Sequence, residues 1–122
     1  MSQTQKEIKR FLIAGISAVA TDFGTYYMLL EYVEPAIAKI LSFLLGTVVA
    51  FVINKYWTFE KHVHSNIEII KFTVWYTLTL FVNVTTNEIV LDLFSMVLLA
   101  FLIATGVSTI LNFIGQKWWV FK

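Results

Sequence analysis

Four apolar segments, each about twenty residues long, occupy most of this chain of 122 residues, at about 11–30, 38–57, 72–91 and 95–115. A helix needs about 20 apolar residues to cross the roughly 30 Å of hydrocarbon in a bilayer. Charged residues make up only 14% of the chain, whereas they form about a quarter of soluble domains. We therefore expect an all-α membrane protein with four transmembrane helices and no room for a soluble catalytic domain.

The second half of the chain repeats the first. A shift of 62 positions sets residues 54–59 (NKYWTF) on residues 116–121 (QKWWVF). A shift of 61 positions aligns earlier pairs: Arg10 with Lys71, Phe11 with Phe72, Asp22 with Asn83 and Glu31 with Asp92. A fixed internal period identifies the building block, which here contains two apolar segments. We expect a single membrane domain over residues 1–122, with repeat one at about 8–60 and repeat two at about 69–122.

The cations predict the orientation. Of nine Lys and Arg residues, only Lys39 falls beside a short turn, whereas the others fall at the N-terminus, at the C-terminus and in a middle loop of about fourteen residues. The positive-inside rule places both termini and this loop in the cytoplasm. Each repeat has an even number of spans, so we expect the two-helix repeats to be parallel, related by an axis along the membrane normal. An A-x-A pattern at residues 18–20 resembles a signal-peptide cleavage site, but the matching segment of repeat two is internal, which favours a retained helix.

Small and amide residues form a stripe on the second and fourth segments. The stripe consists of Ser42, Gly46, Ala50 and Asn54, matched by Ala104, Ser108, Asn112 and Gln116. Spacing of i, i+4 puts each set on one helix face, where small residues let helices approach closely. Packing explains the small members, but the amides need hydrogen-bond partners or water.

Asp22 lies about eleven residues beyond the start of the first segment, roughly 16 Å deep and close to the midplane. A charge there costs at least about 2.5 kcal/mol and usually faces a bundle interior or an aqueous cavity. Asn83 has the matching depth in repeat two and shares its face with Asn87. We expect these three residues to line a sugar path or to couple transport to an ion, with a purely structural hydrogen bond as the alternative for Asp22.

The repeated Lys-aromatic-Trp motif falls at the cytoplasmic interface, where Trp, Tyr and Lys are common on any membrane protein. Its pairing, with Arg10 and Lys71 at the starts of the first and third helices, suggests a cationic ring for a lipid phosphate. The candidate phosphate-binding residues are Arg10, Asn54, Lys55, Trp57, Lys71, Asn112, Gln116, Lys117 and Trp119. No catalytic group, cofactor or metal site is expected, since His62 and His64 have no third ligand nearby in the sequence.

Several of these motifs resemble the GtrA-like family of small four-span membrane proteins, over nearly the whole chain. The motifs are Arg10-Phe11 with Gly15, then Asp22, residues 51–59 (FVINKYWTF), Asn112-Phe113, and Lys117 with Trp119 and Phe121. Members often have arginine near the end of the fourth helix, where Lys117 keeps the charge but loses bidentate geometry. The resemblance implies a protein of bacterial cell-surface polysaccharide assembly, proposed to flip a polyprenyl-phosphate-linked sugar between leaflets.

We accordingly expect a multi-pass protein of the bacterial cytoplasmic membrane that is not an enzyme. Its expected function is flipping of a polyprenyl-phosphate-linked sugar. One alternative is a non-transporting partner that presents polyprenyl phosphate to a membrane glycosyltransferase, and another is a small-multidrug-type exporter that exchanges cations for protons at Asp22. The expected partners are the lipid-linked sugar, membrane lipids, a membrane glycosyltransferase and a second copy in a homodimer, with no nucleic acid.

Overall fold

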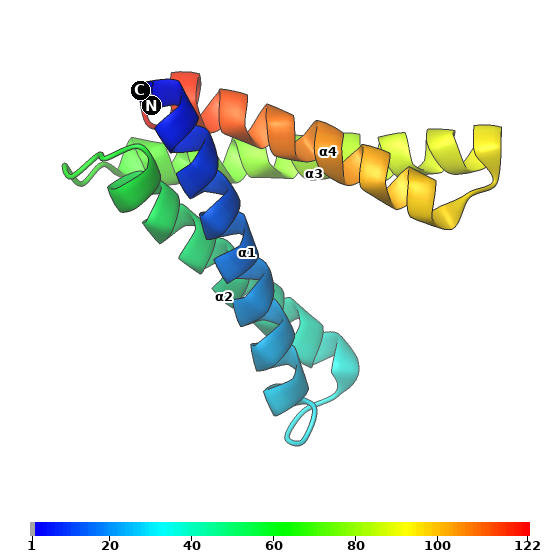
Figure 1. Cartoon of the computed structure of the whole chain (residues 1–122). Helices are drawn as coiled ribbons and strands as arrows, with labels where there is room; N and C mark the ends of the chain where they lie inside the picture. The colour runs from blue at the N-terminus through cyan, green and yellow to red at the C-terminus, as the bar shows by residue number, and fades with distance from the viewer. Residues whose placement is uncertain (1) are drawn as a thin grey trace. The chain divides into compact units, whose positions relative to one another are not determined.

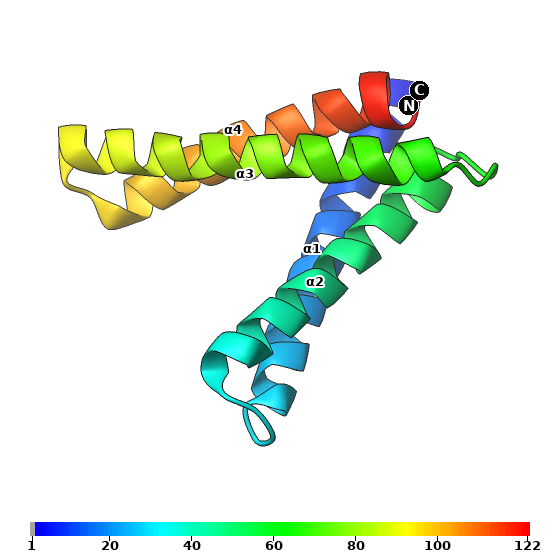
Figure 2. The same cartoon turned by 180° about the vertical axis from the view of Figure 1, so that it is seen from behind.

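The computed structural model describes residues 2–122 and divides the chain into two compact units, one ending at Val63 and the other running from His64 to Lys122. In the first unit, α1 (Gln3–Leu29) and α2 (Pro35–Ile53) form a hairpin, and α2 continues into a π-helical turn, η1 (Asn54–Thr58) (Figure 1). In the second unit, α3 (Asn66–Phe94) and α4 (Val97–Gly115) form a hairpin that ends in η2 (Gln116–Val120) (Figure 2). No strand occurs within residues 2–122.

Four helices, counting η1 and η2 as continuations of α2 and α4, are long and apolar enough to cross a membrane in the described part of the chain. The expected all-α membrane protein with four spans is therefore confirmed. The element order is the same in both units, but the parallel arrangement of two repeats stays a prediction.

The helix ends differ from the expected ones. α1 begins at Gln3 rather than near residue 11, because Ser2 and Gln5 form a capping box that starts the helix within the polar N-terminus. α3 begins at Asn66, so only residues 59–65 separate η1 from α3, about half of the expected middle loop. Hydropathy missed these extensions because polar turns can be helical without being apolar.

The small-residue stripe packs inside each hairpin, against the other helix of the same unit. Ser42, Gly46 and Ala50 are buried on α2, and an added Cβ at Gly46 would lie 2.9 Å from the carbonyl oxygen of Ala18. Close approach of α1 and α2 therefore depends on the missing side chain. Gly15 of α1, by contrast, is exposed and has nothing within 4 Å of its added Cβ.

Hydrogen bonds from three α3 side chains to α4 hold the second hairpin. Trp75 Nε1 donates to the Leu111 carbonyl at 2.8 Å, Thr79 Oγ1 to Asn112 Oδ1 at 2.7 Å, and Asn83 Nδ2 to Ser108 Oγ at 2.8 Å. The donors are four residues apart, so they lie along one face of α3. Hydrogen bonds between apolar helices stabilise membrane hairpins by about 0.6 kcal/mol each on average.

The offset between corresponding residues of the two units changes once. It is 61 for Arg10, Asp22 and Glu31, and 62 from Ser42 onward. The change therefore falls in the stretch that contains the turn of each hairpin. The α1–α2 turn leads into Pro35 at the first helical position, whereas α3 ends at Ser95 in a left-handed conformation with φ of 54°.

Candidate functional site

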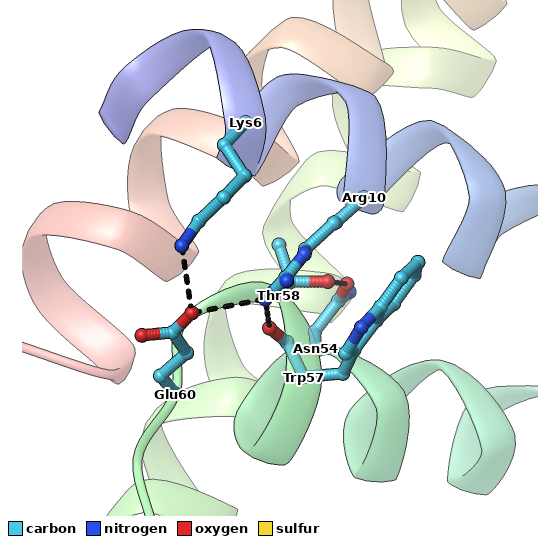
Figure 3. Close-up of polar contacts among 6 residues, drawn as sticks. All are labelled: Lys6, Arg10, Asn54, Trp57, Thr58 and Glu60. Atoms are coloured by element: carbon cyan, nitrogen blue, oxygen red, sulfur yellow. Dashed lines mark hydrogen bonds and ion pairs between the residues drawn. The ribbon is translucent and has the colours of Figure 1, made fainter. Parts of the chain in front are cut away.

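Arg10 binds the end of η1 in the first unit (Figure 3). Its Nη1 donates to the Trp57 carbonyl oxygen at 2.7 Å and to Glu60 Oε1 at 2.9 Å. Its guanidinium carbon lies 4.9 Å from the centre of the Trp57 ring, a cation–π contact. Carbonyls in the last turn of a helix lack intrahelical partners, so Arg10 caps η1 and fixes the indole at the same time.

Glu60 forms ion pairs with two cations at this end. Lys6 Nζ lies 3.0 Å from the same Oε1 that Arg10 binds. The hydrogen bond from Lys6, followed by the charges of Lys6 and Arg10, holds the pKa of Glu60 below its usual range. Glu60 also has a φ of 54°, which is uncommon for residues other than glycine and persists where surrounding contacts hold it. The sequence placed Glu60 in the loop without assigning it this role.

Asn54 and Lys55 lie in the interior rather than at the surface. Thr58 Oγ1 donates to Asn54 Oδ1 at 2.9 Å, and both residues are buried. Lys55 is only 2% exposed, and its Nζ donates to the Val63 carbonyl at 2.7 Å. Every buried side-chain nitrogen and oxygen within residues 2–122 has a hydrogen-bond partner. The Lys55 ammonium therefore holds the segment after η1, whereas Trp57 is 40% exposed.

The second unit repeats the cation–indole contact. Lys71 Nζ lies 5.5 Å from the centre of the Trp119 ring, and Trp75 packs edge-on against the same ring at 6.1 Å. The position that corresponds to Glu60 is Lys122. Within residues 2–122 the structure gives Lys71 no carboxylate partner. The two units thus share one contact and differ in charge around it.

The remaining candidates of the second unit divide between packing and the interface. Gln116 is 2% exposed, and the half-buried Asn112 accepts the hydrogen bond from Thr79, so both amides contribute to packing. Lys117 is half-buried, with Nζ 5.2 Å from the Trp118 ring centre and 6.0 Å from that of Phe113. Aromatic rings at this end thus surround the lysine, and Trp119 is 41% exposed.

Asp22 has a cationic partner that the sequence did not reveal. Lys39 Nζ lies 2.8 Å from Asp22 Oδ2 and 3.0 Å from Oδ1, and Ser42 Oγ donates to Oδ1 at 2.6 Å. Asp22 is seven residues from the end of α1, so it lies roughly 10 Å from that end. The ion pair lies toward the turn of the hairpin, about 18 Å along α1 from Arg10.

Asn83 and Asn87 are uncharged residues of α3 in the second unit. Asn83 binds Ser108, which corresponds to Gly46 of the first unit, and Asn87 is half-buried one turn further along α3. The acid of the first unit and the amide of the second therefore both bind the neighbouring helix. They differ in that Asp22 carries a charge with a counter-ion.

Two buried acids were missed by the sequence analysis. Glu7 and Glu68 are each 6% exposed and are related by the same offset of 61 that relates Arg10 to Lys71. Each lies three residues before that cation, one helical turn away. The repeated glutamate was a signal in the sequence, but hydropathy placed Glu7 in a polar tail.

Residues 10–121 match the family model described as GtrA/DPMS, transmembrane domain. The chain is 30% identical to the uncharacterized membrane protein YngA of Bacillus subtilis (strain 168), over 95% of this chain and 80% of that protein. It is 24% identical to the uncharacterized membrane protein YwcD of the same organism, over 92% of this chain and 94% of that protein. The match spans both hairpins and supports a role in membrane glycan synthesis or in the handling of lipid-linked sugars.

Proposed function

Because the chain belongs to the GtrA/DPMS transmembrane family, we propose that it moves a polyprenyl-phosphate-linked sugar from the cytoplasmic to the outer leaflet of the bacterial cytoplasmic membrane. The transferred sugar serves cell-surface polysaccharide or glycan modification, and both termini lie in the cytoplasm. The observation that carries the proposal is the Lys71–Trp119 pair at the end of the second hairpin, with a ring-to-ammonium distance of 5.5 Å.

The chemistry of this pair suits a lipid phosphate. Lys71 supplies a positive charge without a carboxylate partner in the described chain, and the exposed Trp119 indole carries an N–H donor. A phosphate oxygen that binds both groups gains an ion pair and a hydrogen bond at headgroup level. The isoprenoid chain is accommodated along the apolar helix faces.

In this proposal the Arg10–Trp57 pair has a structural role and does not bind the lipid phosphate. Arg10 already binds Glu60 and the Trp57 carbonyl oxygen with the same Nη1, and both contacts hold the end of η1. We assign Arg10 to closing the end of the first hairpin. Lys55, which is buried, supports the following segment and does not itself reach the lipid.

The test is a leaflet-exchange assay on purified protein in vesicles that contain a fluorescent polyprenyl-phosphate sugar, with an outside quencher reporting accessibility. Lys71→Gln should lower the exchange rate per folded protein about tenfold, the worth of one charge-assisted contact. Lys9→Gln is the matched control, because Lys9 is an exposed cation of the same helix end in the first unit.

Equal rates in the Lys71→Gln and Lys9→Gln proteins would remove Lys71 from the mechanism. Exchange no faster than in protein-free vesicles would reject transport. If the wild-type protein then still bound the lipid phosphate, the function would be presentation of polyprenyl phosphate to a membrane glycosyltransferase.

A further inference from the structure

Lys39 is a charged residue without a place in the proposed phosphate site. It is the fifth residue of α2, at the end of the first hairpin opposite to Arg10. Its side chain is 58% exposed, whereas that of its partner Asp22 is 20% exposed. Asp22 also accepts the 2.6 Å hydrogen bond from Ser42. The carboxylate is therefore held on two sides, while much of the lysine faces outward.

Lys39 lies close to the headgroup layer at the turn of the first hairpin. The 24 residues from Pro35 to Thr58 span about 36 Å, slightly more than the roughly 30 Å of hydrocarbon. Lys39 lies about 6 Å from the start of this helix, so its backbone is only a few ångströms inside the hydrocarbon boundary.

An apolar hollow lies beside the Lys39 side chain. It has a volume of about 310 Å³ and is lined by Lys39, Ile40, Phe43 and Leu44 on one face of α2. Apart from Lys39, the lining residues are apolar. A lysine whose side chain lines an apolar hollow matches a ligand with an anionic head and a hydrocarbon chain.

We propose that Lys39 and this hollow form a second lipid-phosphate site, at the end of the first hairpin remote from the Arg10 end. An ammonium has three N–H donors, and the two oxygens of Asp22 engage two of them. The third binds a phosphate oxygen of an isoprenoid-type lipid whose chain lies along Ile40, Phe43 and Leu44. Asp22 stays in place through Ser42, and its negative charge weakens phosphate binding. The inference rests on the proposed function, in which such a weak site receives the lipid after it has crossed the membrane.

Asp22 therefore sets the affinity of the site. Asp22→Asn keeps the shape and a hydrogen-bonding group but removes the repulsion, so it should tighten phosphate binding about fivefold. Asp22→Asn with Lys39→Gln should abolish that binding. The double variant removes both charges, so that neither is left without its partner.

The experiment measures binding of farnesyl phosphate to detergent-solubilised protein by native mass spectrometry. All proteins carry Lys71→Gln, so that loss of the site in the proposed function cannot be mistaken for loss of this one. Farnesol and inorganic phosphate serve as separate probes, because the site should need both chain and head. Comparable binding of inorganic phosphate alone would overturn the proposal in favour of a simple anion site.

Two further results would overturn it: unchanged affinity in the Asp22→Asn protein, or full binding in the Asp22→Asn/Lys39→Gln protein. If the variants do not fold, the rate of Lys39 acetylation in the protein with native Asp22 tests the site instead. Farnesyl phosphate should slow this acetylation, with Lys9 as the unprotected reference. Equal acetylation of Lys39 with and without farnesyl phosphate would reject the site.

Discussion

Replacing Gly115 by alanine tests whether the end of the second hairpin is as closely packed as the structure indicates. An added Cβ would overlap Nε1 and Cε2 of the Trp75 ring. The ring must then move, which breaks its 2.8 Å hydrogen bond to the Leu111 carbonyl. Overpacking costs about 1–3 kcal/mol and the lost hydrogen bond about 1 kcal/mol, offset by about 1 kcal/mol of helix propensity gained with alanine. We expect a net loss of about 1–3 kcal/mol.

Reversible unfolding in SDS, followed by the helical signal in circular dichroism, measures this difference. The matched control is Gly106→Ala in the same helix, because nothing lies within 4 Å of its added Cβ. That variant should equal or exceed the wild-type stability. Combining Gly115→Ala with Trp75→Leu should restore part of the loss, since the smaller side chain leaves room for the methyl group. A Gly115→Ala protein as stable as the Gly106→Ala control would refute the packing argument.

Two other predictions concern charge and orientation. Lys6 and Arg10 lower the pKa of Glu60, so its ion pairs stabilise the fold above the ordinary glutamate pKa of 4.5, and this stabilisation is lost as the pH falls through the lower pKa of the folded state. The melting temperature of the wild type should therefore exceed that of Glu60→Gln at pH 7, and the two values should converge in acid. A difference in melting temperature that does not change with pH would contradict the ion pairs. A periplasmic reporter should be inactive at the C-terminus and active in the α1–α2 turn, and the opposite pattern would contradict the predicted orientation.

The four spans were predictable because the bilayer sets one length and one composition for every helix that crosses it. The small-residue stripe at Ser42, Gly46 and Ala50 was predictable for a similar reason, since i, i+4 spacing fixes one face. The π-helical form of η1 and η2 was not predictable, because a change from i+4 to i+5 bonding leaves no mark in hydropathy.

Pairings between helices were harder to predict than the helices. The sequence placed Asp22 at the midplane and Lys39 near a turn, but their contact depends on where the hairpin reverses, and α1 proved to begin at Gln3. The expected cationic ring was hard to predict for the same reason, because it also depends on contacts between helices. Lys55 and Lys71 both lie at the border between an apolar segment and a polar one. Lys55 is nevertheless buried, whereas Lys71 contacts an indole, because burial depends on the rotation of each helix about its axis.

The offset between corresponding residues of the two units changes once, from 61 to 62. The length of the hairpin turn can therefore differ between the units while the faces of their helices stay the same. Corresponding contacts form on either side of the turn, since Arg10 meets Trp57 in one hairpin as Lys71 meets Trp119 in the other. An added residue within a helix would turn every later side chain by about 100° and carry buried amides into lipid. The turns are thus the places where chain length can drift during evolution, and where an epitope or protease site can be spliced in while both helices keep their faces.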